Sequence, residues 1–158
     1  VQIARHVGTP GDINVAALRY FNVYGPRQDP NGEYAAAIPK FIDLLLAEEV
    51  PVIFGDGEQT RDFVYMGDVV TANIEAALSG RTGVYNVATG KSVTINELID
   101  TLKTIIGTNV SPTHEDPRTG DIRHSSASVS KAAAELGFRA DTSLEDGLTE
   151  TVEEFRKT

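Results

Sequence analysis

The sequence alternates amphipathic segments with short β-type runs, and the clearest amphipathic segment is 95–106. Apolar residues recur there every three or four positions, which is the spacing of a helix with one buried face. Thr94 and Glu97 open the segment as a predicted capping box, in which each side chain accepts the backbone N–H of the other residue. Gly107 follows the last apolar position and predicts the end of the helix.

Three further segments also predict helices. Apolar positions over 35–49 fit a helical stripe, and Pro39 restricts its start to the residues just before it, because proline is tolerated only in a first turn. A short helix is predicted over 129–136, before a glycine. The last helix follows Ser143, which with Asp146 forms a second predicted capping box.

The segment 68–78 is predicted to be helical as well, with Asp68 as its cap and Gly80 as its end. Its apolar residues define one face, which is expected to be buried against a neighbouring element. The residues of this predicted inward face are Val70, Ile74, Ala77 and Leu78.

Two β-branched and aromatic runs, 14–21 and 83–88, are typical of buried strands in a parallel sheet. The segment 22–34 after the first run is rich in Gly, Pro, Asn and Asp, and it predicts a loop. Ligands of α/β proteins bind at loops that leave the carboxyl ends of parallel strands. Asn22 therefore stands at a position where a ligand is expected.

Shorter β-type runs occur at 51–54 and 60–65, and the Gly55-Asp56-Gly57 sequence between them predicts a hairpin-like turn. A weaker strand pattern covers 110–115. The sequence has no internal repeat and no low-complexity tract. The alternation of strands and helices predicts an α/β fold.

Composition narrows the class of protein further. The 158 residues suit one domain with a proper core, and they carry a formal net charge of −9. This acidity argues against a nucleic-acid partner, because non-specific binding depends on many Lys and Arg contacts to phosphate. No apolar run reaches the roughly 20 residues of a membrane span, so no membrane partner is expected.

The first residues show no signal-peptide pattern. The sequence contains no cysteine, which excludes disulfides and thiolate chemistry and makes a cytoplasmic location the expectation. The three histidines lack the spacing of metal ligands, so no bound metal is expected.

Motifs for catalysis are absent from the sequence. It has no nucleophile elbow, no Walker lysine and no glycine-rich strand-to-helix turn for a dinucleotide. The Gly55-x-Gly57 pair precedes another β-type run instead of a helix. None of the five tyrosines has a lysine four residues later, so no such pair is expected on one helical face.

Two polar loops carry residues that are suited to binding an anion: 54–65 (FGDGEQTRDFVY) and 117–125 (PRTGDIRHS). The planar guanidinium of Arg61 or Arg118 can bind a phosphate bidentately, with the aspartate near it in sequence as its orienting partner. We expect the two loops to face each other and to hold a diphosphate. The alternative is that each arginine forms an ordinary surface ion pair with that aspartate.

Other residues of these loops are open to two interpretations. Asp121 is suited to accept hydrogen bonds from sugar hydroxyls, or to cap a turn. Phe54 is suited to pack against a nucleobase, or to belong to the core. Arg123 and His124 are expected to lie in solvent.

Five motifs, in order along the chain, carry a resemblance to a known family: LRYFNVYGPRQ (18–28), AAAIPKFI (35–42), FGDGEQTRDFVYMGDV (54–69), YNVATGKSVTINEL (85–98) and PRTGDIRHSSASVSKAAAELGF (117–138). The sequence resembles the C-terminal half of extended short-chain dehydrogenases/reductases, and most of all nucleotide-sugar 4-epimerases of the UDP-glucose or UDP-N-acetylglucosamine 4-epimerase kind. The match covers nearly the whole chain from about Asn14. It implies the C-terminal part of a Rossmann-like α/β fold, in which one or two sheet strands adjoin a mixed α/β substrate-binding subdomain and the N-terminal dinucleotide-binding half is absent.

The resemblance also implies a site for a UDP-sugar. Asn22, Arg61 and Arg118 match residues that contact the diphosphate in the family. Asp121 matches an aspartate at the nucleotide ribose, and Phe54 matches a residue beside the uracil pocket.

Ser125 falls where the family has a residue that gates the size of the sugar. The resemblance implies that a serine there leaves room for an N-acetyl group at the sugar C2.

The family uses NAD, which accepts hydride from C4 of the sugar while a tyrosine of a Tyr-x-x-x-Lys pair acts as base. The pair, the glycine-rich NAD turn and the cofactor-binding aspartate belong to the N-terminal half of the family, and this sequence has no counterpart of them. The chain is therefore expected to have no catalytic residue or NAD site of its own and to be inactive alone.

The implied organisation is a single substrate-binding segment over 1–158, of which about 1–22 and 83–106 are expected to pack on the missing half. A complementary N-terminal chain or self-association is the expected protein partner, because unpaired strand edges and apolar faces recruit partners. Two other functions stay open: a non-catalytic structural or interaction module, and a fragment of a related nucleotide-sugar dehydratase or decarboxylase.

Overall fold

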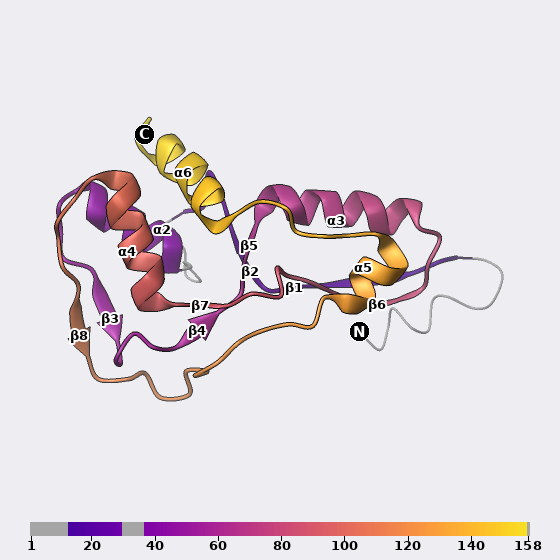
Figure 1. The fold of residues 1–158 in the computed structure, drawn as a ribbon, viewed down its shortest axis with the longest axis horizontal. Helices are drawn as coiled ribbons and strands as arrows, with labels where there is room; N and C mark the ends of the chain where they lie inside the picture. Colours follow the sequence, from indigo (N-terminus) through magenta and orange to yellow (C-terminus); the bar gives the residue numbers. More distant parts are fainter. Residues whose placement is uncertain (1–12, 30–36, 158) are drawn as a thin grey trace.

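The computed structural model of the protein describes residues 13–29 and 37–157, and its elements are spread along one long axis (Figure 1). The described strands are β1 (Ala16–Tyr20), β2 (Asn22–Tyr24), β3 (Val52–Phe54), β4 (Thr60–Arg61), β5 (Phe63–Tyr65), β6 (Gly83–Val87), β7 (Val93–Thr94) and β8 (Thr113–Glu115). The described helices are α2 (Ala37–Leu46), α3 (Met66–Leu78), α4 (Ile95–Ile106), α5 (Ser130–Leu136) and α6 (Leu144–Phe155). Within the described ranges, no helix is long and apolar enough to cross a membrane. The mixture of strands and helices confirms the predicted α/β class.

The strands form separate two-stranded pairs. The pairs β1–β6, β2–β5 and β3–β8 are parallel, and the pair β4–β7 is antiparallel. The hairpin predicted between 51–54 and 60–65 is therefore wrong. Gly55 and Gly57 do turn the chain, with φ angles of 84° and 78°. Their flanking strands nevertheless pair elsewhere, because β8 lies alongside β3 and β7 lies alongside β4.

Two hydrophobic cores lie at the two ends of the molecule (Figure 1). The first is built by α2, α4 and α6 with β3, and the second by β1, β6, α3 and α5. The strands β2 and β5 run between the two cores, and successive side chains of a strand point to opposite faces. Tyr24 and Tyr65 accordingly pack in the first core. Val23 and Val64, which alternate with them, pack in the second.

The prediction of a buried strand over 14–21 is only partly right. β1 is half-buried to exposed, with Tyr20 46% exposed, and β6 is its one strand partner in the described part of the chain. The loop predicted over 22–34 is wrong at its start, because Asn22–Tyr24 forms β2 along β5. Residues 30–36 of the loop and of the start of the next helix lie outside the described residues.

The helix α4 confirms its predicted capping box and its predicted end. The backbone N–H of Glu97 donates to the Thr94 hydroxyl over 3.0 Å, and the backbone N–H of Thr94 donates to Glu97 Oε2 over 2.8 Å. Gly107 follows in the left-handed conformation. The apolar stripe of α4 is buried against α2 and α6.

The second capping box, at the start of α6, is only half formed. The Ser143 hydroxyl accepts the backbone N–H of Asp146 over 3.1 Å, as predicted. The Asp146 carboxylate, however, accepts from the Ser143 hydroxyl over 2.6 Å instead of from the Ser143 backbone. An aspartate side chain is one methylene shorter than the glutamate of a complete box, and it stays at the hydroxyl.

The predicted inward face of α3 points outward. Val70 and Ile74 are each 53% exposed and Leu78 is 79% exposed, whereas Val69 and Ala72 are buried. The helix packs against β1, β2, β5 and α5 along this other face, so tertiary contacts selected the buried side.

The cap predicted for this helix is also wrong. α3 begins two residues before Asp68, and the residue that precedes it, Tyr65, makes no side-chain cap. Asp68 is 7% exposed, and its carboxylate accepts the backbone N–H of Asp141 over 3.2 Å. Asp68 therefore anchors the chain before α6 and does not cap the helix.

We predict that Thr94→Ala lowers the free energy of unfolding by about 1 kcal/mol, because it leaves an N-terminal N–H of α4 without its acceptor. Urea unfolding followed by circular dichroism measures the effect. Thr104→Ala, the same change on the exposed side of α4, is the matched control, and its effect is expected to be near zero or slightly stabilising. Equal losses for the two variants would contradict the role of the capping box.

Candidate functional site

A cavity of about 480 Å³ lies between the first core and the loop 117–125. Its walls come from β2, the start of α2, β3, β4 and that loop. Five of the six residues predicted to bind substrate line it: Asn22, Phe54, Arg61, Arg118 and Asp121. The two polar loops therefore do meet at one hollow, although they are about sixty residues apart in the sequence.

The orienting partner of Arg61 is Asp121 from the other loop. Arg61 Nη2 donates to Asp121 Oδ1 over 2.5 Å, and Arg61 Nη1 donates to the Thr60 carbonyl oxygen over 2.8 Å. The prediction of an orienting aspartate beside Arg61 in sequence is wrong for Asp62. Adjacent residues of an extended chain point to opposite sides, so Asp62 faces away from the cavity.

Asp62 has a structural task instead. Its side chain is fully buried and accepts the backbone N–H and the hydroxyl of Thr89 over 2.9 and 2.7 Å, and the backbone N–H of Gly90 over 3.0 Å. Its carbonyl oxygen accepts the side-chain amide of Asn22 over 2.9 Å. Asp62 thus ties the turn after β6 to the strand exit where Asn22 lies.

Arg118 is held by an aromatic ring. Its guanidinium carbon lies 3.8 Å from the centre of the Phe54 ring, which is the geometry of a cation–π contact. Among the residues that the structure describes, Arg118 forms no ion pair. Among the described residues, the charged ones that line the cavity are Arg61, Arg118 and Asp121, and they give this hollow a positive excess in an acidic chain.

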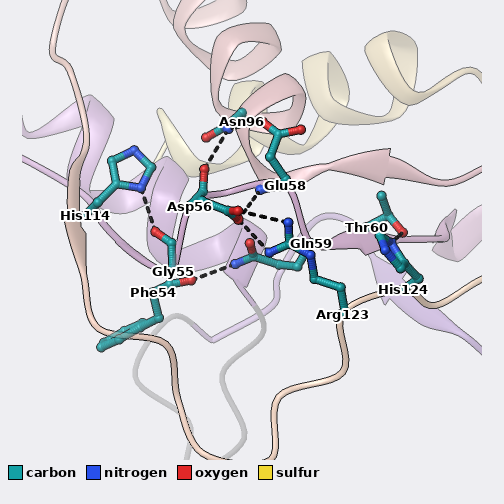
Figure 2. Close-up of polar contacts among 10 residues, drawn as sticks. All are labelled: Phe54, Gly55, Asp56, Glu58, Gln59, Thr60, Asn96, His114, Arg123 and His124. Carbon is teal, nitrogen blue, oxygen red and sulfur yellow. Dashed lines mark hydrogen bonds and ion pairs between the residues drawn. The ribbon is translucent and has the colours of Figure 1, made fainter.

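Figure 2 shows how the loop 117–125 is attached beside the cavity. Arg123 Nη1 and Nη2 donate to the two carboxylate oxygens of Asp56 over 2.6 and 2.9 Å. The backbone N–H of Thr60 donates to the Arg123 carbonyl oxygen over 2.9 Å, and the Thr60 hydroxyl lies 3.2 Å from His124 Nδ1. Arg123 and His124 are exposed, as expected, and both also attach the loop to the turn and strand beside it.

Ser125 takes part in this attachment and does not line the cavity. Its backbone N–H donates to the Thr60 carbonyl oxygen over 3.1 Å. Ser125 is the one predicted site residue that the described structure does not bring to the hollow.

The turn between β3 and β4 is supported from two sides (Figure 2). His114 Nδ1 lies 2.8 Å from the Gly55 carbonyl oxygen, and the Asn96 side-chain amide donates to the Asp56 carbonyl oxygen over 3.0 Å. Asn96 packs so closely on Gly57 that a Cβ at position 57 would overlap it. Glycine is required there both for this reason and for its φ of 78°.

The hydroxyl of Tyr24 is unsuited to act as a base in this cavity. Burial raises the pKa of Tyr24, and nearby Asp68 raises it further. The hydroxyl also lies within 3.4 Å of the Leu144 carbonyl oxygen, to which it donates. Arg61 and Arg118, in contrast, are side chains of the cavity wall that are suited to bind an anion.

Two glutamines of the cavity wall were not indicated by the sequence. Gln59 donates through Nε2 to the Phe54 carbonyl oxygen over 2.8 Å, and Gln28 donates through Nε2 to the Val23 carbonyl oxygen over 3.1 Å. Both line the cavity. A glutamine in a polar loop carries no pattern that separates a buried role from an exposed one, so no sequence signal identified them.

Comparison with known proteins places this geometry in a family. Residues 1–88, more than half of the chain, match the NAD dependent epimerase/dehydratase family. The chain belongs to this family. It spans about half the length of the curated relatives it matches, with 45% and 46% of two of them covered.

Three solved structures are similar to the chain. A UDP-glucose 4-epimerase from Thermotoga maritima with UDP-glucose is 48% identical with a TM-score of 0.87, over 90% of this chain and 46% of that one. A UDP-N-acetylglucosamine 4-epimerase from Methanobrevibacter ruminantium, in complex with UDP-N-acetylmuramic acid, is 47% identical with a TM-score of 0.88, over 92% and 47%. A UDP-glucose 4-epimerase from Thermus thermophilus in complex with NAD is 36% identical with a TM-score of 0.79, over 89% and 46%. These neighbours confirm the resemblance and the Rossmann-like α/β fold class.

We predict that Arg123 controls the titration of Asp56. Hydrogen bonds from Arg123 and from the backbone N–H of Glu58 lower the pKa of Asp56 from 3.8 to about 2. Because the folded protein binds this proton less readily than the unfolded chain, the contribution of the pair to stability is complete above about pH 4 and is lost as the pH falls toward 2. Carboxyl-carbon NMR should report the low pKa.

Arg123→Ala is expected to return the pKa of Asp56 toward its ordinary value. Arg139→Ala, a change at an exposed arginine outside the cavity, should leave the titration as it is. A low pKa that persists in Arg123→Ala would show that the ion pair is not its cause.

Proposed function

We propose that this chain supplies the UDP-sugar site of an NAD-dependent sugar 4-epimerase. The observation that carries the proposal is the meeting of Arg61 and Arg118 at one cavity whose charged residues leave a positive excess. The family supports it, since two of its similar solved members hold a UDP-sugar.

The diphosphate is proposed to bind between the two arginines. Arg61 is held in place by Asp121 and the Thr60 carbonyl oxygen, and Arg118 is held over Phe54. Guanidinium groups that are positioned before the ligand arrives lose less conformational freedom on binding. Asn22 lies at the same cavity, with its amide fixed to the backbone of the strand that carries Arg61.

The nucleoside is proposed to lie at the Phe54 end of the cavity. Asp121 uses Oδ1 for Arg61 and its side chain is 39% exposed, which leaves Oδ2 for a ribose hydroxyl. Phe54 contributes an aromatic face at the end of β3. Ser125 is proposed to limit the size of the sugar, as the resemblance implies, although it lies outside the present lining of the cavity.

The cofactor and the base are proposed to come from outside this chain. The described turn with two glycines, Gly55 and Gly57, joins β3 to β4 and does not lead from a strand into a helix. It therefore does not fit a dinucleotide. The chain binds and orients the nucleotide-sugar, and by itself it does not epimerise it.

The remainder of such an enzyme is proposed to pack on β1, β6 and the outer face of α3. β1 is half-buried to exposed, and α3 exposes Val70, Ile74 and Leu78. Within the predicted packing range 83–106, α4 already buries its apolar stripe against α2 and α6, so β6 is the part assigned to this interface. An apolar face of this kind also favours association with another protein chain.

Isothermal titration calorimetry with UDP tests the binding proposal. We expect saturable binding that Arg118→Ala weakens by about 10-fold to 100-fold, because the arginine donates charge-assisted hydrogen bonds to phosphate. Arg139→Ala is the matched control and should bind UDP like the unchanged chain. The proposal fails if UDP does not bind, or if the two arginine variants weaken binding equally.

Complementation tests whether this chain binds the substrate while another chain supplies the cofactor and the base. The chain alone with NAD is expected not to interconvert UDP-glucose and UDP-galactose, and adding a separately produced NAD-binding half of a 4-epimerase is expected to produce activity. Ile74→Asp, on the exposed face of α3, should reduce that activity while UDP binding stays unchanged, since the substitution places a charge in the proposed interface. Turnover by the chain alone, or complementation that is indifferent to Ile74→Asp, would contradict the proposal.

A further inference from the structure

Asp62 lies where β4 ends and β5 begins, and three strand pairs are joined at this residue (Figure 1). β4 pairs with β7, and β5 pairs with β2. The turn that follows β6, the partner of β1, is hydrogen-bonded to the Asp62 side chain. The placement of Asp62 therefore sets how these three pairs lie relative to one another.

Both oxygens of the Asp62 carboxylate have partners inside the protein. Thr89 donates to Oδ1 through its backbone N–H and its hydroxyl over 2.9 and 2.7 Å, and the backbone N–H of Gly90 donates to Oδ2 over 3.0 Å. Asp62 is fully buried, and it is not among the residues that line the cavity. The carboxylate can therefore influence a ligand in the cavity only through other residues or through its charge.

The main chain of Asp62 holds Asn22. The Asp62 carbonyl oxygen accepts the Asn22 backbone N–H over 3.2 Å and Nδ2 of the Asn22 side chain over 2.9 Å. A carbonyl oxygen only accepts, so this contact assigns the NH₂ end of the Asn22 amide. The NH₂ group has two hydrogens, and the second one is left for an anion in the cavity that Asn22 lines.

The residue before Asp62 in the chain is Arg61, which lines the same cavity. Adjacent residues of an extended chain point to opposite sides, so the burial of Asp62 directs Arg61 to the cavity. One buried carboxylate thus fixes the main chain beside two of the residues that are proposed to bind the diphosphate.

We infer that Asp62 is a positioning residue for the diphosphate, which holds Asn22 and Arg61 toward the ligand without contacting it. The inference rests on the proposed function, since it concerns the same site. The positioning role and the charge of Asp62 have opposite effects on binding. A nearby carboxylate repels an anion, so its neutralisation alone would tighten UDP binding. Loss of positioning weakens UDP binding, because the freed side chains must be ordered when the ligand binds.

Calorimetry with UDP on Asp62→Asn and Asp68→Asn tests the inference on the full chain. Asp68 is the matched control, because it is also a buried aspartate that accepts a backbone N–H and does not line the cavity. We expect Asp62→Asn to weaken UDP binding about tenfold and Asp68→Asn to change it by less than about twofold. Unchanged or tighter binding in Asp62→Asn, or equal weakening in the two variants, would overturn the inference.

Thr89→Val is a milder variant that keeps the shape of the side chain and removes one of the donors to Asp62. Thr89 does not line the cavity of the proposed site, so it affects UDP through Asp62. We expect about threefold weaker UDP binding, with the circular dichroism spectrum of the unchanged chain. Unchanged affinity in Thr89→Val would overturn the inference even if Asp62→Asn does not fold.

A double-mutant cycle with Asn22→Ala separates positioning from a general loss of stability. If Asp62 acts through Asn22, Asp62→Asn weakens UDP binding less in the Asn22→Ala background than in the unchanged chain. Additive losses in the two substitutions would contradict the inference.

The outcomes separate the two proposals. Failure of the unchanged chain to bind UDP removes the proposed function and the inference with it. Binding of UDP that is weakened in Arg118→Ala and retained in Asp62→Asn keeps the proposed function and overturns the role of Asp62 alone.

Discussion

The site depends on the attachment of the loop 117–125 to β4. Backbone hydrogen bonds on both sides of His124 join Arg123 and Ser125 to Thr60. Bringing together segments about sixty residues apart costs chain entropy, and the helices, strands and ion pair between them offset that cost. Without the attachment, Arg118 would not be held over the Phe54 ring.

Polar side chains of the cavity wall are held in place by contacts within the protein. Arg61 is fixed by an aspartate of the opposite loop, Arg118 by an aromatic ring, and Gln59 by a main-chain carbonyl. These supports come from the loop 117–125 and from Phe54 on β3, so the geometry of the cavity is a property of the assembled fold. Such preorganisation lowers the entropy cost of binding at the proposed site.

The sequence predicted local features well and distant pairings poorly. The Thr94–Glu97 capping box and the helix end at Gly107 are confirmed, because every atom involved lies within a few residues. Five of the six predicted site residues do line one cavity, and these residues were selected by the resemblance to a family, because local patterns do not indicate which distant segments meet. The prediction of the buried face of α3 is wrong, because the apolar residues of the helix do not indicate which side of it packs against the strands. Asp62 and Gln59 carry roles that depend on partners no spacing reveals.

The sequence by itself determined where α4 begins and ends, where α6 begins, and which loops carry arginines. These are matters of spacing, capping chemistry and residue type over short distances. The tertiary structure alone decided that Asp121, and not Asp62, holds Arg61, and that the buried Asp62 holds the turn at Thr89 instead. The reason is that an ion pair or a buried hydrogen bond is set by proximity in space, which only the packed fold establishes.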